Sequence, residues 1–124
     1  MAMSIYFFDS FAVIEYIRDN SKFVHFFEEQ TGVLTLLNML EVYFCVLREG
    51  GKVKADIVFD ILSPLVIQPE AEEVKQAMEF RLDNKKKNLS YADSLGYIVA
   101  RKRSFPFLTG DRQFEGMKGV AFVK

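Results

Sequence analysis

Four acidic residues in this 124-residue chain have the types and positions needed to bind a divalent cation. Asp9 and Asp111 directly follow short apolar runs that are typical of buried strands, whereas Glu41 and Asp93 lie in the first turns of expected helices. Carboxylates that face one crevice repel one another unless divalent ions neutralise them, and Mg²⁺ or Mn²⁺ prefers carboxylate and water ligands. We therefore predict that these four acids form a Mg²⁺ or Mn²⁺ site.

Each acid also has a purely structural explanation. Asp9 is placed to cap a helix, Asp93 completes a capping box with Ser90, and Asp111 follows a glycine as turn residues often do. Glu41 is harder to explain in this way, because it lies in an apolar helix where an unpaired carboxylate is costly. A small α/β protein whose acids are all caps and turns is therefore the first competing hypothesis.

The elements that must position these acids alternate along the chain. Apolar runs rich in strand formers predict strands over residues 5–8, 33–36, 65–67, 107–109 and 120–123. Patterns of helical period and end signals predict helices over 11–18, 21–30, 37–48, 53–62, 69–87 and 90–103. Such alternation predicts an α/β fold of three layers (α/β/α) with a mostly parallel, about five-stranded central sheet, formed by one domain over residues 1–124. In such sheets ligands bind at the carboxyl ends of strands, where Asp9 and Asp111 are expected.

Composition excludes several other classes of function. The formal net charge is −1, from 16 basic and 17 acidic residues, so the chain lacks the excess of positive charge that a non-specific nucleic-acid binder carries. A single cysteine, Cys45, excludes an internal disulfide and a cysteine-rich zinc site, and the only histidine, His25, has no triad partner. Neither phosphate-binding glycine motif is present. The short apolar runs and the lack of a signal peptide predict a cytoplasmic protein that does not enter a membrane.

Four segments, YFFDS, LLNMLEVYF, LSYADSLGYIVA and FLTGDRQF, together resemble the PIN-domain ribonucleases, in particular the VapC-type toxins of toxin–antitoxin pairs. The resemblance spans nearly the whole chain and rests on the order and spacing of the segments. It implies a metal-dependent endonuclease that hydrolyses RNA, with Asp9, Glu41, Asp93 and Asp111 as catalytic metal ligands. It also implies that Ser10 and Thr109 are the hydroxyls that orient these ligands.

Two departures from the family pattern lie close to the acids. Asn38 replaces the small or hydroxylated residue that often precedes the glutamate, and Gln113 stands where a further Asp or Asn is frequent. They leave open a second competing hypothesis, a PIN-like binding module without catalysis. Gly96 stands where alanine is usual, and a glycine still lets its helix approach the sheet closely.

The resemblance also implies an RNA substrate and an antitoxin that covers the acidic pocket or an apolar groove. We also expect a homodimer, because the chain is rich in phenylalanine. Thirteen phenylalanines are many for this length, and Phe23, Phe26 and Phe27 share one side of a predicted helix. These three rings belong either to the core or to a groove for an amphipathic partner helix.

Overall fold

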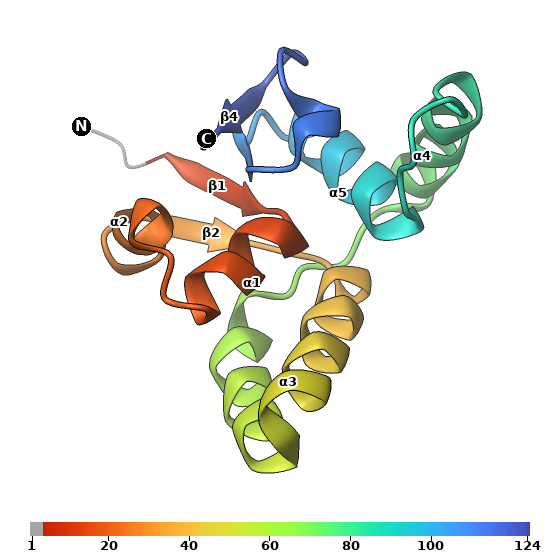
Figure 1. Ribbon diagram of the computed structural model, residues 1–124. Helices are drawn as coiled ribbons and strands as arrows, with labels where there is room; N and C mark the ends of the chain where they lie inside the picture. The colour runs from red at the N-terminus through yellow and green to blue at the C-terminus, as the bar shows by residue number, and fades with distance from the viewer. Residues whose placement is uncertain (1–3) are drawn as a thin grey trace.

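The computed structural model describes residues 4–124 and contains a parallel sheet with helices on both faces (Figure 1). The strands are β1 (Ile5–Phe8), β2 (Thr31–Val33), β3 (Phe107–Thr109) and β4 (Val120–Phe122). They lie in the order β2-β1-β3-β4, and every pair is parallel. The predicted α/β class and parallel sheet are confirmed, with β1 and β3 at the centre.

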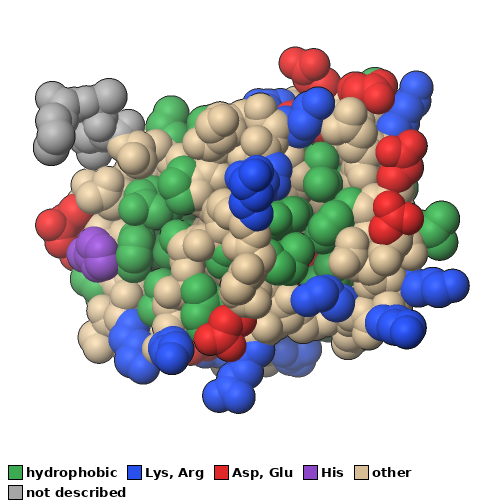
Figure 2. All heavy atoms as spheres, turned by 90° about the horizontal axis from the view of Figure 1, so that it is seen from above, with side chains coloured by type: hydrophobic (Ala, Val, Ile, Leu, Met, Phe, Trp, Pro, Cys, Tyr) green, Lys and Arg blue, Asp and Glu red, His purple; other side chains and the backbone are tan. Residues whose placement is uncertain are grey.

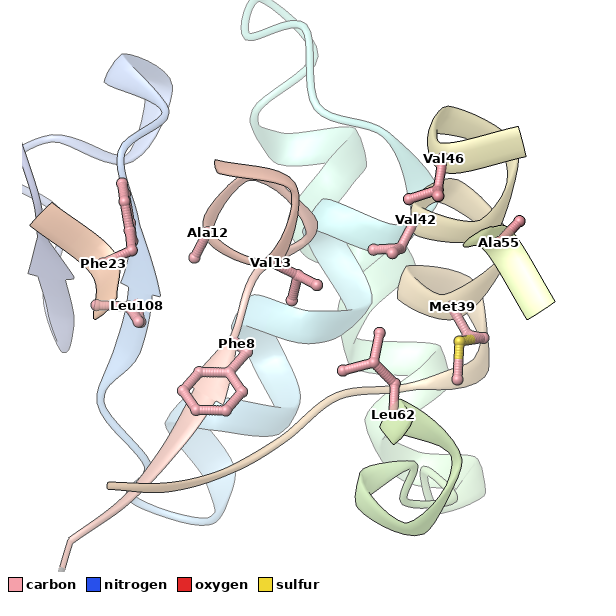
Figure 3. Close-up of a cluster of buried hydrophobic side chains, with 10 residues drawn as sticks. All are labelled: Phe8, Ala12, Val13, Phe23, Met39, Val42, Val46, Ala55, Leu62 and Leu108. Atoms are coloured by element: carbon pink, nitrogen blue, oxygen red, sulfur yellow. The ribbon is translucent and has the colours of Figure 1, made fainter. Parts of the chain in front are cut away.

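Adjacent residues of the central strands point to opposite faces of the sheet and enter separate cores. Phe7 packs in a cluster with Phe107 and with residues from α4 (Ala71–Asp83) and α5 (Tyr91–Lys102). Phe8 packs on the other face with Leu108 and with residues from α1 (Ser10–Ile17) and α3 (Leu36–Leu62), as Figure 3 shows. Continuous apolar strands are required because both faces are covered, so the sheet is the middle layer of three.

The remaining short elements connect these layers. A 3₁₀ turn (Ser21–Phe23) leads into α2 (Val24–Glu28), and two further 3₁₀ turns lie at Ser63–Leu65 and Arg112–Phe114. Phe23 is fully buried in the cluster that contains Phe8, and the half-buried Phe26 and Phe27 pack against the same cluster. None of the helices within residues 4–124 combines the length and hydrophobicity that a membrane span requires. The face of the molecule shown in Figure 2 carries both acidic and basic side chains, with apolar side chains exposed between them.

α3 consists of two arms that meet at a glycine. Gly51 has a φ of 85° inside the helical span, a conformation that residues with a side chain rarely adopt. The arms pack on each other, since the Tyr43 hydroxyl donates a 2.7 Å hydrogen bond to Asp56 and its ring meets Phe59 edge-on. Figure 1 shows the second arm folding back beside the first. The predicted break after residue 48 is therefore present, as a sharp turn rather than a loop.

The expected fifth strand over residues 65–67 is wrong: the described residues contain four strands. Val66 forms only an isolated bridge with Leu34, through hydrogen bonds from Leu34 N to Leu65 O and from Ile67 N to Leu34 O. The 3₁₀ turn at Ser63–Leu65 occupies the start of this segment, and Pro69, which has no N–H, follows shortly after it. Too few residues remain to extend the ladder.

The second strand begins earlier than expected, at Thr31, where a helix stop was predicted. Gly32 explains the shift, because a Cβ atom at this position would lie 2.1 Å from the Phe8 ring. The missing side chain lets β2 pair with β1 while Phe8 lies across it. Thr35, predicted to be in the strand, is instead the N-cap of α3.

Candidate functional site

A cleft with a volume of about 420 Å³ opens at the carboxyl ends of the two central strands. Asp9 follows β1, and Asp111 follows Gly110 after the neighbouring β3. The chain passes from β1 to β2 on one side of β1, and β3 pairs with β1 on its other side. The edge at β1 and β3 is therefore a topological switch point, where ligands bind in α/β sheets. All four predicted acids line the cleft: Asp9, Glu41, Asp93 and Asp111.

Asp9 is the deepest of these acids, with only 1% of its surface exposed. It occupies the N-cap position of α1 but makes no side-chain capping hydrogen bond. Its Oδ2 accepts a 2.7 Å hydrogen bond from the Thr109 hydroxyl, while Oδ1 is buried without a partner among the described residues. Because a buried polar atom without a partner is costly, the capping explanation does not account for this carboxylate.

Glu41 is held from α1 through a chain of side-chain hydrogen bonds. The Ser10 hydroxyl donates to Glu41 Oε1 at 2.7 Å, and Asn38 Nδ2 donates to the Ser10 hydroxyl at 3.0 Å. Asn38 is itself fixed, since its Oδ1 accepts from both the backbone N–H and the hydroxyl of Thr35. The fully buried Asn38 therefore positions Ser10 and Glu41. From the sequence, Asn38 was interpreted only as a departure from the family pattern, so this role was missed. Its place three residues after a threonine N-cap was the available signal.

Asp93 and Asp111 do carry out the structural roles that the sequence suggests for them. Asp93 Oδ2 accepts from the Ser90 backbone N–H in a capping box that starts α5. Asp111 Oδ1 accepts from the Gln113 backbone N–H in the following turn. Both side chains remain half-buried at the cleft, and each has a second carboxylate oxygen that makes no hydrogen bond to these partners. Capping thus fixes the direction of each carboxylate without using both oxygens.

Gln113 joins the two loops from which these acids emerge. Its Nε2 donates to the Asn88 carbonyl at 3.0 Å, and its Oε1 accepts from the Asn88 backbone N–H. Asn88 lies just before the N-cap of α5, so this pair of hydrogen bonds couples the segment that starts α5 to the segment that carries Asp111. A glutamine is long enough to make this bridge.

The cleft concentrates negative charge. Burial raises the pKa of Asp9 to about 8, and the charge of Asp93 adds to this effect against the hydrogen bond from Thr109, which lowers it. Burial also raises the pKa of Asp93, with a further contribution from the charge of Glu41, while hydrogen bonds from Ser90 oppose the shift. Like charges close together in a buried place disfavour ionisation unless a cation compensates them.

The oxygen donors and the buried free Oδ1 of Asp9 fit a hard divalent cation in chemistry and location. Over residues 4–124 no three acidic, cysteine or histidine side chains are arranged to hold one ion together. Mg²⁺ commonly binds through one or two carboxylates and keeps several waters, so the arrangement suits a partly hydrated ion. The assignment of Asp9, Glu41, Asp93 and Asp111 as metal ligands stays a prediction.

Residues 6–120 match the family model of the PIN domain. The chain belongs to the PIN domain family. Among curated proteins, no sequence matches this PIN domain significantly. The predicted family is confirmed.

Solved structures share the fold of this PIN domain. A toxin–antitoxin complex from Klebsiella pneumoniae superposes with a TM-score of 0.72 at 17% identity, covering 93% of this chain and 94% of the other. VapC20 of Mycobacterium tuberculosis, a toxin that cleaves the sarcin–ricin loop, gives 0.70 at 18% identity, covering 86% and 87%. At sequence identities this low, the superpositions show a common fold and nothing further.

Proposed function

We propose that this PIN domain is a metal-dependent endoribonuclease of the VapC type, the toxin of a toxin–antitoxin pair. The observation that carries the proposal is the buried Asp9 carboxylate, which lines a cleft together with three more acids and whose Oδ1 has no partner in the described chain. Carboxylates held together in a partly buried place destabilise the fold unless a cation compensates their charges. Membership of the PIN family and the similarity in fold to VapC20 support the choice of RNA as substrate.

In the proposed mechanism Asp9, Glu41, Asp93 and Asp111 hold Mg²⁺ or Mn²⁺ with water. The ion, when bound, supplies activation of a water molecule and stabilisation of the charge that develops on the phosphodiester. Thr109 and Ser10 keep the carboxylates of Asp9 and Glu41 oriented through their hydrogen bonds. A carboxylate is the proton acceptor within the cleft, since the only histidine, His25, does not line it.

The proposed antitoxin contacts an apolar groove of about 360 Å³ between α1, α2 and the second arm of α3. Phe27, Ile17 and Ile61 line this groove, and Ile61 is 67% exposed. Grooves of this kind bind the apolar face of an amphipathic helix. Of the two alternatives for the three phenylalanines, Phe23 belongs to the core and Phe27 lies at the groove. The toxin–antitoxin complex with the same fold supports a protein partner.

The proposed homodimer uses the exposed apolar side chains on the first arm of α3. Leu36, Leu40 and Leu47 recur at near-helical spacing and are 58%, 58% and 39% exposed. Sedimentation of the purified protein tests this surface. We expect a dimer for the wild type and a monomer for Leu36→Asp. A wild type that sediments as a monomer at all concentrations would exclude the homodimer.

An RNA cleavage assay with added Mg²⁺, Mn²⁺ or EDTA tests the proposed activity. We expect cleavage that requires either metal and is lost in EDTA and in Asp9→Asn. Metal-independent cleavage that persists in Asp9→Asn would refute the mechanism.

A PIN-like binding module without catalysis is the second candidate, because no group of three ligands is already assembled in the described structure. Thermal melting separates the two candidates. Binding of Mn²⁺ stabilises the folded state and raises the melting temperature of an enzyme with this site. Absence of both cleavage and metal-induced stabilisation in the wild type would favour the binding module.

A further inference from the structure

The first arm of α3 carries a second group of side chains into the acidic cleft. Phe44 and Arg48 follow Glu41 by three and seven residues, so all three lie on one face of the helix and line the same cleft. Arg48 lies about 10 Å along the helix axis from Glu41, with Phe44 between them. The cleft thus continues from a carboxylate to an aromatic ring and then to a guanidinium.

Phe44 is unusually exposed for a side chain that lines a cleft, at 60%. The guanidinium of Arg48 lies over its ring at 5.4 Å from the centroid. The other large apolar residues exposed on this arm, Leu36, Leu40 and Leu47, do not line the cleft. Phe44 therefore differs from the apolar stripe in position and in chemistry.

Of the two arginines that line the cleft, Arg48 is the one less engaged by carboxylates. Arg18 donates to Glu49 at 2.6 Å and to Glu15 at 3.2 Å, so two acids already compensate its charge. Arg48 makes only a 3.6 Å ion pair with Glu49, and 62% of its side chain is exposed. An exposed pair of this kind is weak and gives way readily to a phosphate.

We propose that Phe44 and Arg48 bind the nucleotide next to the cleaved phosphodiester, with the base stacked on Phe44 and its phosphate paired with Arg48. This inference rests on the proposed ribonuclease function and names the part of the substrate that the cleft recognises. An aromatic ring beside an arginine is the arrangement that binds single-stranded RNA, because every base has a face that stacks. The negative phosphate also matches the guanidinium of Arg48, whose positive charge is weakly compensated by Glu49 at this end of an otherwise acidic cleft.

The experiment measures binding of a fluorescent single-stranded RNA of mixed sequence in the Asp9→Asn background with Mn²⁺, so that cleavage does not enter. Phe44→Leu keeps an apolar side chain and removes the ring, and we expect about tenfold weaker binding, the size expected for losing one stacked base. Phe44→Trp restores binding. Leu82→Ala is the control, because Leu82 is an apolar side chain of α4, 70% exposed and outside both the cleft and the proposed dimer surface, and it leaves binding unchanged. Leu40→Ala, on the proposed dimer surface, measures any effect of self-association on RNA binding.

Two further measurements identify the groups involved. Arg48→Gln reduces the slope of log affinity against log salt by about 0.7, the change expected for one lost phosphate contact to a single strand. An RNA backbone of the same length without bases binds the wild type and Phe44→Leu equally. Melting curves identify any variant that is not folded, and the exposed positions of Phe44 and Arg48 make folding of these variants expected.

Three results would overturn the inference. The first is that Phe44→Leu binds RNA as tightly as the parent does. The second is that Phe44→Leu and Leu40→Ala lose RNA affinity equally and also lose self-association, and the third is that no variant binds RNA. The second result would assign Phe44 to a contact between protein chains. Absence of cleavage by the wild type, with Phe44-dependent RNA binding intact, would refute the ribonuclease and leave this binding element supported.

Discussion

The hydroxyl of Thr109 donates a 2.7 Å hydrogen bond to Asp9 Oδ2 across the two central strands. The same oxygen of Thr109 accepts a 3.0 Å hydrogen bond from the Asp111 backbone N–H. One hydroxyl therefore fixes the direction of the Asp9 carboxylate and the path of the chain that carries Asp111. The other oxygen of that carboxylate, Oδ1, has no partner among the described residues, so its lone pairs remain free for a ligand.

Asp9→Asn should abolish metal-dependent RNA cleavage and raise the stability of the metal-free protein. Without metal, the folded state must either protonate Asp9 or bury its charge among like charges, a cost that Asn avoids, and the substitution also removes a proposed metal ligand. A gain of about 1 kcal/mol raises the melting temperature of a chain of this size by roughly 4 °C. Melting with and without Mn²⁺, alongside the cleavage assay, measures both effects. A stability change close to zero with full cleavage would indicate that Asp9 is only structural.

The stability of the metal-free protein should fall as the pH rises from 3.8 toward about 8. The folded state keeps a proton on Asp9 up to about pH 8, whereas the unfolded chain releases it near 3.8. Because the folded state binds more protons over this interval, its advantage is complete below 3.8 and is lost by about pH 8. The difference in melting temperature between Asp9→Asn and the wild type should widen between about pH 5 and about pH 8. A constant difference would contradict the raised pKa of Asp9.

Asn38→Ala should lower both stability and activity. It removes the donor to the Ser10 hydroxyl, and it leaves the buried N–H and hydroxyl of Thr35 without the acceptor that they share. Loss of partners for buried polar groups costs about 1–3 kcal/mol. Cleavage should fall about 10–100-fold, as expected for groups that orient metal ligands. Denaturant unfolding and kinetics of the folded variant measure the two losses.

Asn20→Ala is the control for this variant, because Asn20 also joins two residues by side-chain hydrogen bonds but does not line the cleft. It should change stability slightly and leave cleavage unaffected. Similar cleavage by both variants would exclude a positioning role for Asn38.

Ile61→Asp should weaken binding of an antitoxin helix at least tenfold, because it introduces a charge into the apolar groove. Ile57→Asp is the matched control, one turn earlier on the same arm, exposed to a similar degree and outside the groove. Calorimetric titration of each variant with the antitoxin measures the difference. Equal affinities would place the antitoxin elsewhere.

The class of fold and the position of the acids were predictable because they depend on local patterns. Apolar runs such as Phe7–Phe8 mark strands covered on both faces, and an acid at the end of such a run faces the ligand edge of the sheet. The missing fifth strand and the early start of β2 were not predictable in this way. They depend on how Ser63–Leu65 turns and on the contact between Gly32 and the Phe8 ring, which join segments distant in sequence.

The roles of individual polar residues were only partly predictable. The hydroxyls of Ser10 and Thr109 do donate to carboxylates of the cleft, but each pairs with an acid distant in sequence, Glu41 and Asp9 respectively, which the family pattern did not specify. The roles of Asn38 and Gln113 appear only when α1 lies against α3 and when the loop before α5 meets the turn after β3. A departure from a family pattern thus turned out to be a set of specific hydrogen bonds.

Thr109 and Asp9 stand 100 positions apart, and the strand that carries Thr109 inserts between β1 and β4 near the end of the chain. During synthesis Asp9, Glu41 and Asp93 leave the ribosome before β3 can pair with β1. No shorter nascent chain that ends before residue 109 contains the complete cleft. We expect formation of the β1–β3 pair, a contact of high sequence separation, to be the late step that brings all four acids together.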